Sequence, residues 1–161
     1  MDRSFFPYGN KSKEFLLKRT IYLCNYLIKR GVDEIVLACN TLSLLVLDEI
    51  KPYFNVKISG VFELFDFDLY KNSLFIGTKN TINEMNRRNI KIDKLILNDL
   101  IDSIENDKNI DEIIKKNKDI FDKYPYVLLG CTHFINIKNK IPNSISQDDL
   151  YLKKLCSEST L

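Results

Sequence analysis

Two short segments of the sequence combine a thiol with polar side chains in a way that suits proton transfer. Residues 39–41 read Cys-Asn-Thr, and residues 131–133 read Cys-Thr-His and contain the only histidine. Each segment follows a run of apolar residues, 35–38 and 127–129. Two thiols on opposite sides of a carbon centre can invert it without a cofactor, because one removes a proton while the other delivers one.

The four cysteines have different surroundings. A lone cysteine in an apolar segment is more often a small buried hydrophobe than a catalyst, and Cys24 and Cys156 are interpreted in that way. The matching contexts of Cys39 and Cys131, with His133 two residues further on, favour a chemical role for these two. No Cys-x-x-Cys pair is present, and the only clustered pair of zinc ligands is Cys131 with His133, so a zinc site is not expected.

The elements that would position these segments alternate along the chain. Apolar runs predict strands and amphipathic runs predict helices. Strands are expected over residues 34–38, 56–61, 73–77, 94–97 and 126–129, with a short one after 141. Helices are expected over residues 12–30, 41–51, 80–88, 99–106 and 110–123 and at the carboxyl end. This order predicts an α/β fold with parallel sheets flanked by helices, in which ligands bind beyond the carboxyl ends of the strands.

Two of these helices have a predicted buried face. In the first helix, which Gly31 ends, the face comprises Phe15, Leu16, Leu23, Tyr26 and Leu27. In the helix over 110–123 it comprises Ile110, Ile113, Ile114, Ile120 and Phe121.

The composition excludes several classes of protein. The chain of 161 residues is 45% hydrophobic, enough to bury a core, and its 24 basic residues nearly balance 22 acidic ones. A nucleic-acid partner is therefore not expected. No apolar run approaches the roughly 20 residues of a membrane span, and the first residues do not have the pattern of a signal peptide. We expect a cytoplasmic protein with reduced thiols.

Four motifs together resemble one family. They are Pro-Tyr-Gly-Asn-Lys-Ser at 7–12, Ala-Cys-Asn-Thr at 38–41, Ile-Gly-Thr-Lys-Asn-Thr-Ile at 76–82 and Leu-Gly-Cys-Thr-His-Phe at 129–134. In this order they resemble glutamate racemase, of the aspartate/glutamate racemase family, over about residues 2–150. The resemblance implies cofactor-independent interconversion of L- and D-glutamate, which supplies D-glutamate for peptidoglycan.

The resemblance also implies roles for single residues. Cys39 and Cys131 match the two acid/base thiols, and His133 is expected to help Cys131 change its protonation state. Thr78 and Thr81 match a threonine pair near the substrate carboxylate, and Glu105 falls near the position of a glutamate beside the histidine. The positions that match substrate-binding residues are Tyr8, Gly9, Asn40, Thr41, Thr132 and His133.

Plain structural roles also fit some of these residues. Residues 7–9 suit a turn before a capped helix. Asn40 and Thr41, or Thr78 and Thr81, suit the first turn of a helix. Because a helix N-terminus also attracts a carboxylate, the two interpretations of the threonines overlap.

The resemblance predicts two similar halves with the site between them, and a homodimer. Residues 1–60 plus 141–161 would form the first half, and residues 61–140 the second. The family's opening strand and its Asp-Ser-Gly turn have no counterpart in the sequence, and this predicts weak or absent activity and a less stable first half. A binding protein that has lost the chemistry and a racemase acting on aspartate are the alternatives.

Overall fold

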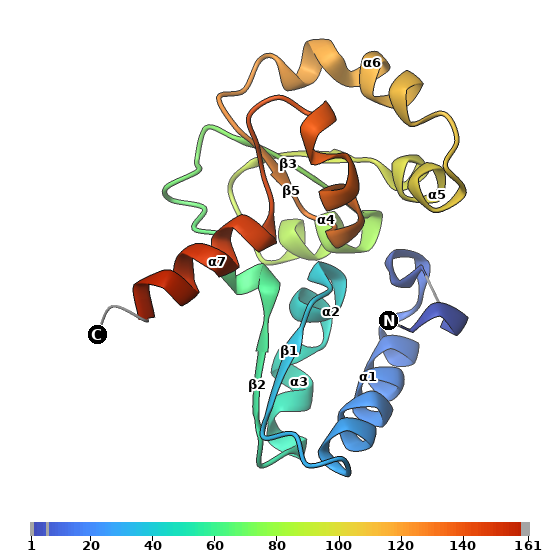
Figure 1. Cartoon of the computed structure of the whole chain (residues 1–161), viewed down its shortest axis with the longest axis vertical. Helices are drawn as coiled ribbons and strands as arrows, with labels where there is room; N and C mark the ends of the chain where they lie inside the picture. Colours follow the sequence, from blue (N-terminus) through green and yellow to red (C-terminus); the bar gives the residue numbers. More distant parts are fainter. Residues whose placement is uncertain (1, 6, 159–161) are drawn as a thin grey trace.

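The computed structural model describes residues 2–5 and 7–158 and contains two parallel sheets. In the first sheet, β1 (Glu34–Leu37) pairs with β2 (Lys57–Gly60). The second sheet has the strand order β4-β3-β5-β6. Its strands are β3 (Leu74–Gly77), β4 (Asp93–Ile96), β5 (Val127–Leu129) and β6 (Ser144–Ile145). Figure 1 shows the two sheets in separate halves, with β1 and β2 in the lower half. The predicted fold class is confirmed.

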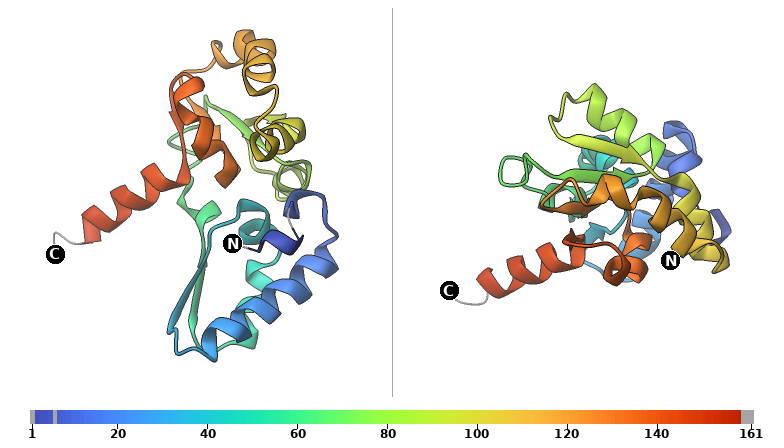
Figure 2. Two further views of the ribbon diagram at one scale, coloured as in Figure 1. Left: turned by 45° about the vertical axis from the view of Figure 1, so that its right-hand side comes forward. Right: turned by 90° about the horizontal axis from the view of Figure 1, so that it is seen from above.

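Three helices lie on one side of the first sheet. They are α1 (Lys13–Ile28), α2 (Asn40–Leu45) and α3 (Leu47–Ile50), and Figures 1 and 2 show them beside β1 and β2. Alternation along β1 buries Ile35 and Leu37 against them, whereas Val36 is 37% exposed on the opposite face.

The predicted buried face of α1 is partly wrong. The residues of α1 that the fold buries are Leu16, Thr20 and Cys24, spaced four apart, while Tyr26 and Leu27 are exposed. Cys24 therefore packs as a small hydrophobe, as predicted. The ends of the helix agree with the sequence: the Ser12 hydroxyl accepts a hydrogen bond from the Phe15 amide, and Gly31 has a φ of +86°.

The single helix expected over residues 41–51 is divided. Val46, with a φ of −128°, separates α2 from α3, and the 3-10 turn η3 (Lys51–Tyr53) follows because Pro52 cannot continue an α-helix. The strand expected over 56–61 is shorter, because residues 61–64 form the 3-10 turn η4 (Val61–Leu64).

The second half has helices α4 (Lys79–Arg87), α5 (Asn98–Asn106) and α6 (Ile110–Phe121). Its core is built around Leu74, Ile76, Val127 and Leu129, all almost fully buried. Of the predicted face of α6, Phe121 is buried, while the four isoleucines pack against this core and remain partly exposed.

The predicted boundary between the halves is wrong at one point. Residues 144–145 were expected in the first half, but they form β6, in which Ile145 pairs with Leu128 of the second sheet. Helix α7 (Gln147–Glu158) then begins beside η4, between the halves, and extends away from the body of the molecule (Figures 1 and 2). Residues 159–161 of the predicted last helix lie outside the described residues. The rest of the division stays a prediction.

Three further 3-10 segments lie near the strand ends or the start of the chain. They are η1 (Arg3–Phe5), η2 (Tyr8–Asn10) and η5 (Thr132–Lys140). Among the described residues, no helix is long and apolar enough to cross a membrane.

Candidate active site

Cys39 and Cys131 occupy equivalent places in the two halves. Cys39 follows β1 and is the N-cap of α2, and Cys131 follows β5 and precedes η5. Both are free thiols, both are partly buried, and both have an extended backbone. The alternation of strand and helix therefore brings the two thiols to the carboxyl ends of their strands, as predicted.

The surroundings of both thiols disfavour the thiolate form. Burial is the main cause that raises the pKa of the Cys131 thiol to about 12; the charge of Cys39 contributes to this rise, whereas hydrogen bonds from the backbone of His133 and Phe134 oppose it. Burial also raises the pKa of Cys39, although hydrogen bonds from the backbone of Leu42 and from Thr41 offset part of this effect. Both thiols are thus protonated at neutral pH, and forming one thiolate makes the other harder to form.

His133 links Cys131 to a carboxylate. Its Nδ1 atom lies 3.6 Å from the Cys131 sulfur, and its Nε2 atom lies 3.0 Å from Oε1 of Glu105 in α5. Burial lowers the pKa of His133, and this outweighs the opposite effect of Glu105. In a neutral imidazole that donates its Nε2 proton to Glu105, Nδ1 carries no proton and can accept the one from the thiol.

Three threonine hydroxyls connect the two halves. The Oγ1 atoms of Thr41 and Thr81 are 3.0 Å apart, those of Thr78 and Thr81 are 2.9 Å apart, and those of Thr41 and Thr78 are 3.3 Å apart. All three side chains are buried. Thr78 also caps α4 by accepting a hydrogen bond from the Thr81 amide at 3.2 Å. The capping interpretation is therefore correct for Thr78, and the cluster also places hydroxyls beside Cys39.

Asn40 is the first residue of α2, and its side chain is only 2% exposed. Neither its Oδ1 nor its Nδ2 atom has a hydrogen-bond partner among the described residues. A buried, unpaired amide costs about 1–3 kcal/mol, so such a group normally has an occupant that satisfies it. Because Asn40 directly follows Cys39, a polar ligand bound at this site would supply the missing hydrogen bonds.

Residues 8 and 9 lie at the junction of the halves, where η2 contacts both α2 and α4. Gly9 is buried, and a Cβ atom there would come within 2.7 Å of the Thr78 Cγ2 atom. The Tyr8 hydroxyl donates a hydrogen bond to Asp2, whose carboxylate also accepts two from Arg19, each at 2.7 Å. Burial and Asp2 raise the pKa of Tyr8, whereas the Arg19 guanidinium lowers that of Asp2.

This arrangement adds two residues that the sequence reasoning missed, Asp2 and Arg19. Their pairing holds the Tyr8 ring in place, and no spacing rule links residues 2, 8 and 19. Thr132 lies in the first turn of η5, partly buried and adjacent to Cys131. The structure therefore brings Cys39, Asn40, Thr41, Thr78 and Thr81 together, and separately groups Cys131, His133 and Glu105.

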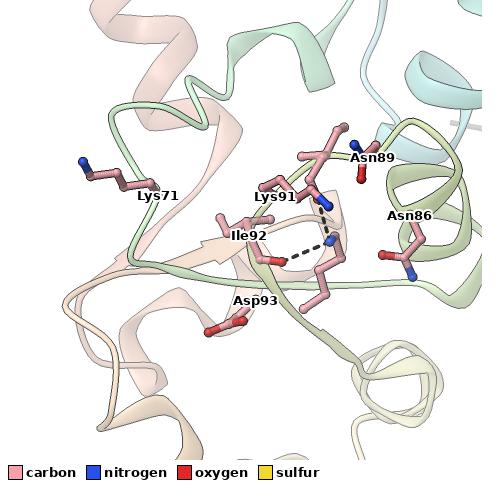
Figure 3. A pocket seen from close by; sticks show the side chains of 8 residues that line it. Lys71, Asn86, Asn89, Lys91, Ile92 and Asp93 are labelled. Carbon is pink, nitrogen blue, oxygen red and sulfur yellow. Dashed lines mark hydrogen bonds between the residues drawn. The ribbon is translucent and has the colours of Figure 1, made fainter.

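Two open hollows lie outside this site. One of about 400 Å³ is lined by Lys71, Asn86, Asn89, Lys91, Ile92 and Asp93, among others (Figure 3). Asp93 is the first residue of β4, so this hollow is at the amino end of the sheet, opposite the thiols. The other, of about 330 Å³, lies between residues 11–13 and α4. Within the described part of the chain, no group of three potential metal ligands occurs.

Comparison with solved structures identifies the class of fold. Glutamate racemase from Francisella tularensis, solved with D-glutamate, superposes with a TM-score of 0.77 at 24% identity, covering 99% of this chain and 70% of that one. Aspartate racemase from Picrophilus torridus superposes with a TM-score of 0.60 at 21% identity, covering 89% of this chain and 67% of that one. The chain thus has the fold of the aspartate/glutamate racemases.

Comparison with known sequences indicates one member of this class, glutamate racemase. The chain is 30% identical to glutamate racemase of Buchnera aphidicola from Schizaphis graminum and 32% identical to that of Aquifex aeolicus. These matches cover 88% of this chain in both cases, but 63% and 62% of the relatives, so the chain spans less than two thirds of their length. No protein-family model matches the chain. The curated homologues are glutamate racemases, and the resemblance predicted from the four motifs is confirmed.

Proposed function

We propose that this chain interconverts L- and D-glutamate by transferring protons at the α carbon, with Cys39 and Cys131 as the two acid/base groups. The observation that carries the proposal is the placement of two free thiols at equivalent strand ends in the two halves. The names of the homologues support glutamate as the substrate.

The proposed reaction conserves protons. One cysteine, as thiolate, takes the proton from the α carbon and becomes a thiol. The other, as thiol, gives its proton to the opposite face of that carbon and becomes a thiolate. Burial raises the pKa of both thiols, which makes the thiolate scarce but strongly basic, and a strong base is needed for a weakly acidic carbon. No cofactor takes part in the proposed reaction.

The neighbouring side chains have roles in this proposal. Glu105 orients His133, and His133 exchanges a proton with Cys131 when Cys131 changes between thiol and thiolate. The unpaired amide of Asn40 and the threonine hydroxyls supply donors to the two carboxylates of the substrate. Tyr8, Gly9 and Thr132 complete the proposed binding site.

Glutamate is preferred to aspartate on two grounds. The sequence relatives named above are glutamate racemases, and the solved structures include one from Escherichia coli with L-glutamate and an activator. This chain also superposes better on the Escherichia coli glutamate racemase, with a TM-score of 0.72, than on the Picrophilus torridus aspartate racemase, with a TM-score of 0.60.

The cellular setting is also a proposal. Two reactive thiols must stay reduced, and this favours the cytoplasm. The D-glutamate formed would serve peptidoglycan synthesis, as the resemblance implies. A homodimer stays a prediction from the same resemblance.

Proton NMR of the protein with L-glutamate in D₂O tests the proposal, because racemisation replaces the α proton by deuterium. We expect exchange that is lost in Cys39→Ser and in Cys131→Ser. Cys24→Ser is the control, because Cys24 is a buried residue of α1 that packs in the first-half core and has no role in the proposed site. Exchange that persists in both site variants would contradict the proposal, and binding of glutamate without exchange in the folded wild type would favour the non-catalytic alternative. A turnover rate equal to that of a full-length relative would contradict the expectation of weak activity.

A further inference from the structure

A second buried amide has no hydrogen-bond partner in the part of the chain that the structure describes. The side chain of Gln147 is 2% exposed, and neither its Oε1 nor its Nε2 atom has a hydrogen-bond partner among the described residues. Burying an amide without a partner costs free energy. A polar group that is not part of the described chain, such as a bound ligand, would offset this cost.

The sheet register places Gln147 at the same edge as the catalytic thiol. Val127 pairs with Ser144 and Leu128 with Ile145, and these pairs end β6; Gln147 follows two residues after Ile145, as Gly130 follows two residues after Leu128, so both residues lie beyond the carboxyl ends of two neighbouring strands. Neighbouring strands are about 4.8 Å apart. Gln147 therefore begins α7 beside the carboxyl end of β5.

The strand order places Gln147 and the threonine cluster on opposite sides of β5. In the order β4-β3-β5-β6, strand β5 lies between β3, which leads to Thr78, and β6, which leads to Gln147. The carboxyl end of β5, which leads to Cys131, therefore lies between Thr78 on one side and Gln147 on the other. Because α7 and α2 both contact η4, Gln147 and Asn40 also start helices that share one neighbour.

The charges next to Gln147 are already compensated. Asp149 accepts hydrogen bonds from the Ser146 amide and hydroxyl, each at 2.9 Å, and forms an ion pair with Lys138. Burial raises the pKa of Asp149, but the hydrogen bonds from Lys138 and Ser146 lower it by more. The net pKa is therefore below its ordinary value, and the carboxylate stays charged. The Asp148 carboxylate accepts a hydrogen bond from the Ser146 hydroxyl. Since these groups satisfy one another, Gln147 is the unpaired group in the first turn of α7.

We propose that Gln147 binds substrate by donating its side-chain N–H to a carboxylate oxygen of the acidic amino acid, at the end remote from the threonine cluster. This inference rests on the proposed function, because it takes the ligand to be the amino acid held at Cys131. It makes the start of α7, after the second half's last strand, part of the binding site.

The test compares Gln147→Ala with a matched control at the other end of the sheet. Ser73 is 1% exposed, its hydroxyl is unpaired among the described residues, and it precedes β3 at the amino edge. We expect Gln147→Ala to raise KM for glutamate about tenfold, as for loss of a hydrogen bond to a charged group, with a smaller change in kcat. Ser73→Ala should leave KM unchanged.

Binding of D-glutamate by calorimetry, with the melting temperature of the free protein, gives a second readout. In Gln147→Ala the affinity should fall while the melting temperature is kept or raised. Gln147→Met, of similar length and unable to donate, should behave in the same way and covers the case in which the alanine variant does not fold. A KM and an affinity within twofold of wild type would overturn the inference, whether or not the melting temperature falls.

The same experiments separate this inference from the proposed function. Exchange in the wild type that Gln147→Ala leaves unchanged overturns the inference alone. Glutamate binding that depends on Gln147 in a wild type without exchange overturns the proposed racemisation and keeps the inference. A folded wild type that neither binds nor exchanges glutamate overturns both.

Discussion

The Nε2 atom of His133 lies 3.0 Å from Oε1 of Glu105, while Nδ1 of the same ring lies 3.6 Å from the Cys131 sulfur. The carboxylate thus favours the tautomer in which Nε2 carries the proton and Nδ1 is able to accept one from the thiol. Glu105 comes from α5 and His133 from η5, so this relay depends on the contact between those two elements.

Replacing Glu105 tests the relay. Glu105→Gln removes the charge that holds the ring, and we expect exchange of the α proton to slow about tenfold, because a misoriented base loses part of its contribution to catalysis. The measurement is kcat with KM, since an orienting residue should change mainly kcat. Asp102→Asn, a carboxylate on the same helix, is the control and should leave the rate unchanged. A large increase in KM with unchanged kcat would contradict this role.

The rate should rise with pH. Both thiols have a raised pKa, that of Cys131 about 12, so near neutral pH only a small fraction of molecules holds a thiolate. We expect kcat/KM in the exchange assay to increase by nearly tenfold per pH unit between about pH 7 and pH 8. A profile that is flat across this interval would contradict the pKa directions.

Stability should change with pH in the opposite sense. The pKa of Cys131 is higher in the folded chain than its ordinary value of 9.0, so above about pH 9 the unfolded state loses its proton first. The free energy of unfolding should therefore decrease as the pH rises from about 9 to about 12. Urea denaturation across this range measures the decrease, which should be smaller in Cys131→Ser. An equal decrease in the variant would assign the effect to other groups.

The threonine cluster should contribute to binding as well as stability. Thr81→Val keeps the shape of a fully buried side chain and removes its hydroxyl. We expect KM for glutamate to rise several-fold and the free energy of unfolding to fall by about 1 kcal/mol. Thr20→Val is the matched control, because Thr20 is a buried threonine in α1 that donates to the Leu16 carbonyl. It should lose similar stability and keep its KM.

Gly130 is required for packing immediately before Cys131. A Cβ atom there would lie 2.0 Å from Cζ of the buried Phe75 and 2.7 Å from the Ile76 carbonyl oxygen. Gly130→Ala should therefore destabilise the fold by roughly 3 kcal/mol. Gly31→Ala, with open space around it but a φ of +86°, should cost about 1 kcal/mol. Urea denaturation compares the two, and an equal or smaller loss in Gly130→Ala would contradict this explanation.

Much of the fold could be predicted from local patterns. The apolar runs before Cys39 and Cys131 indicated parallel strands, and both strands end where the polar residues begin. The strand before Cys131 is buried throughout, as an unbroken apolar run predicts, whereas the one before Cys39 is exposed at Val36, so burial on both faces was predicted wrongly there. Ser12 and Gly31 marked the ends of α1 because capping and positive φ depend on single residue types. Since ligands bind at the carboxyl ends of parallel strands, the same patterns predicted the place of the site.

Other features depended on packing between distant segments. The exposed Tyr26 in α1 and the break at Val46 follow from which neighbours each residue meets, and an amphipathic pattern does not name those neighbours. Likewise, Ser144 and Ile145 join the second sheet because β5 offers a free edge, which their own sequence does not show.

The sequence by itself determined the two thiol segments, the alternation of strands and helices, and the likeness to glutamate racemases. Only the tertiary structure decided that Asp2 and Arg19 hold Tyr8, and that the buried amides of Asn40 and Gln147 have no hydrogen-bond partner among the described residues. The physical reason is that residue types and spacing specify local backbone structure, whereas hydrogen-bond pairing across the fold depends on how whole elements pack.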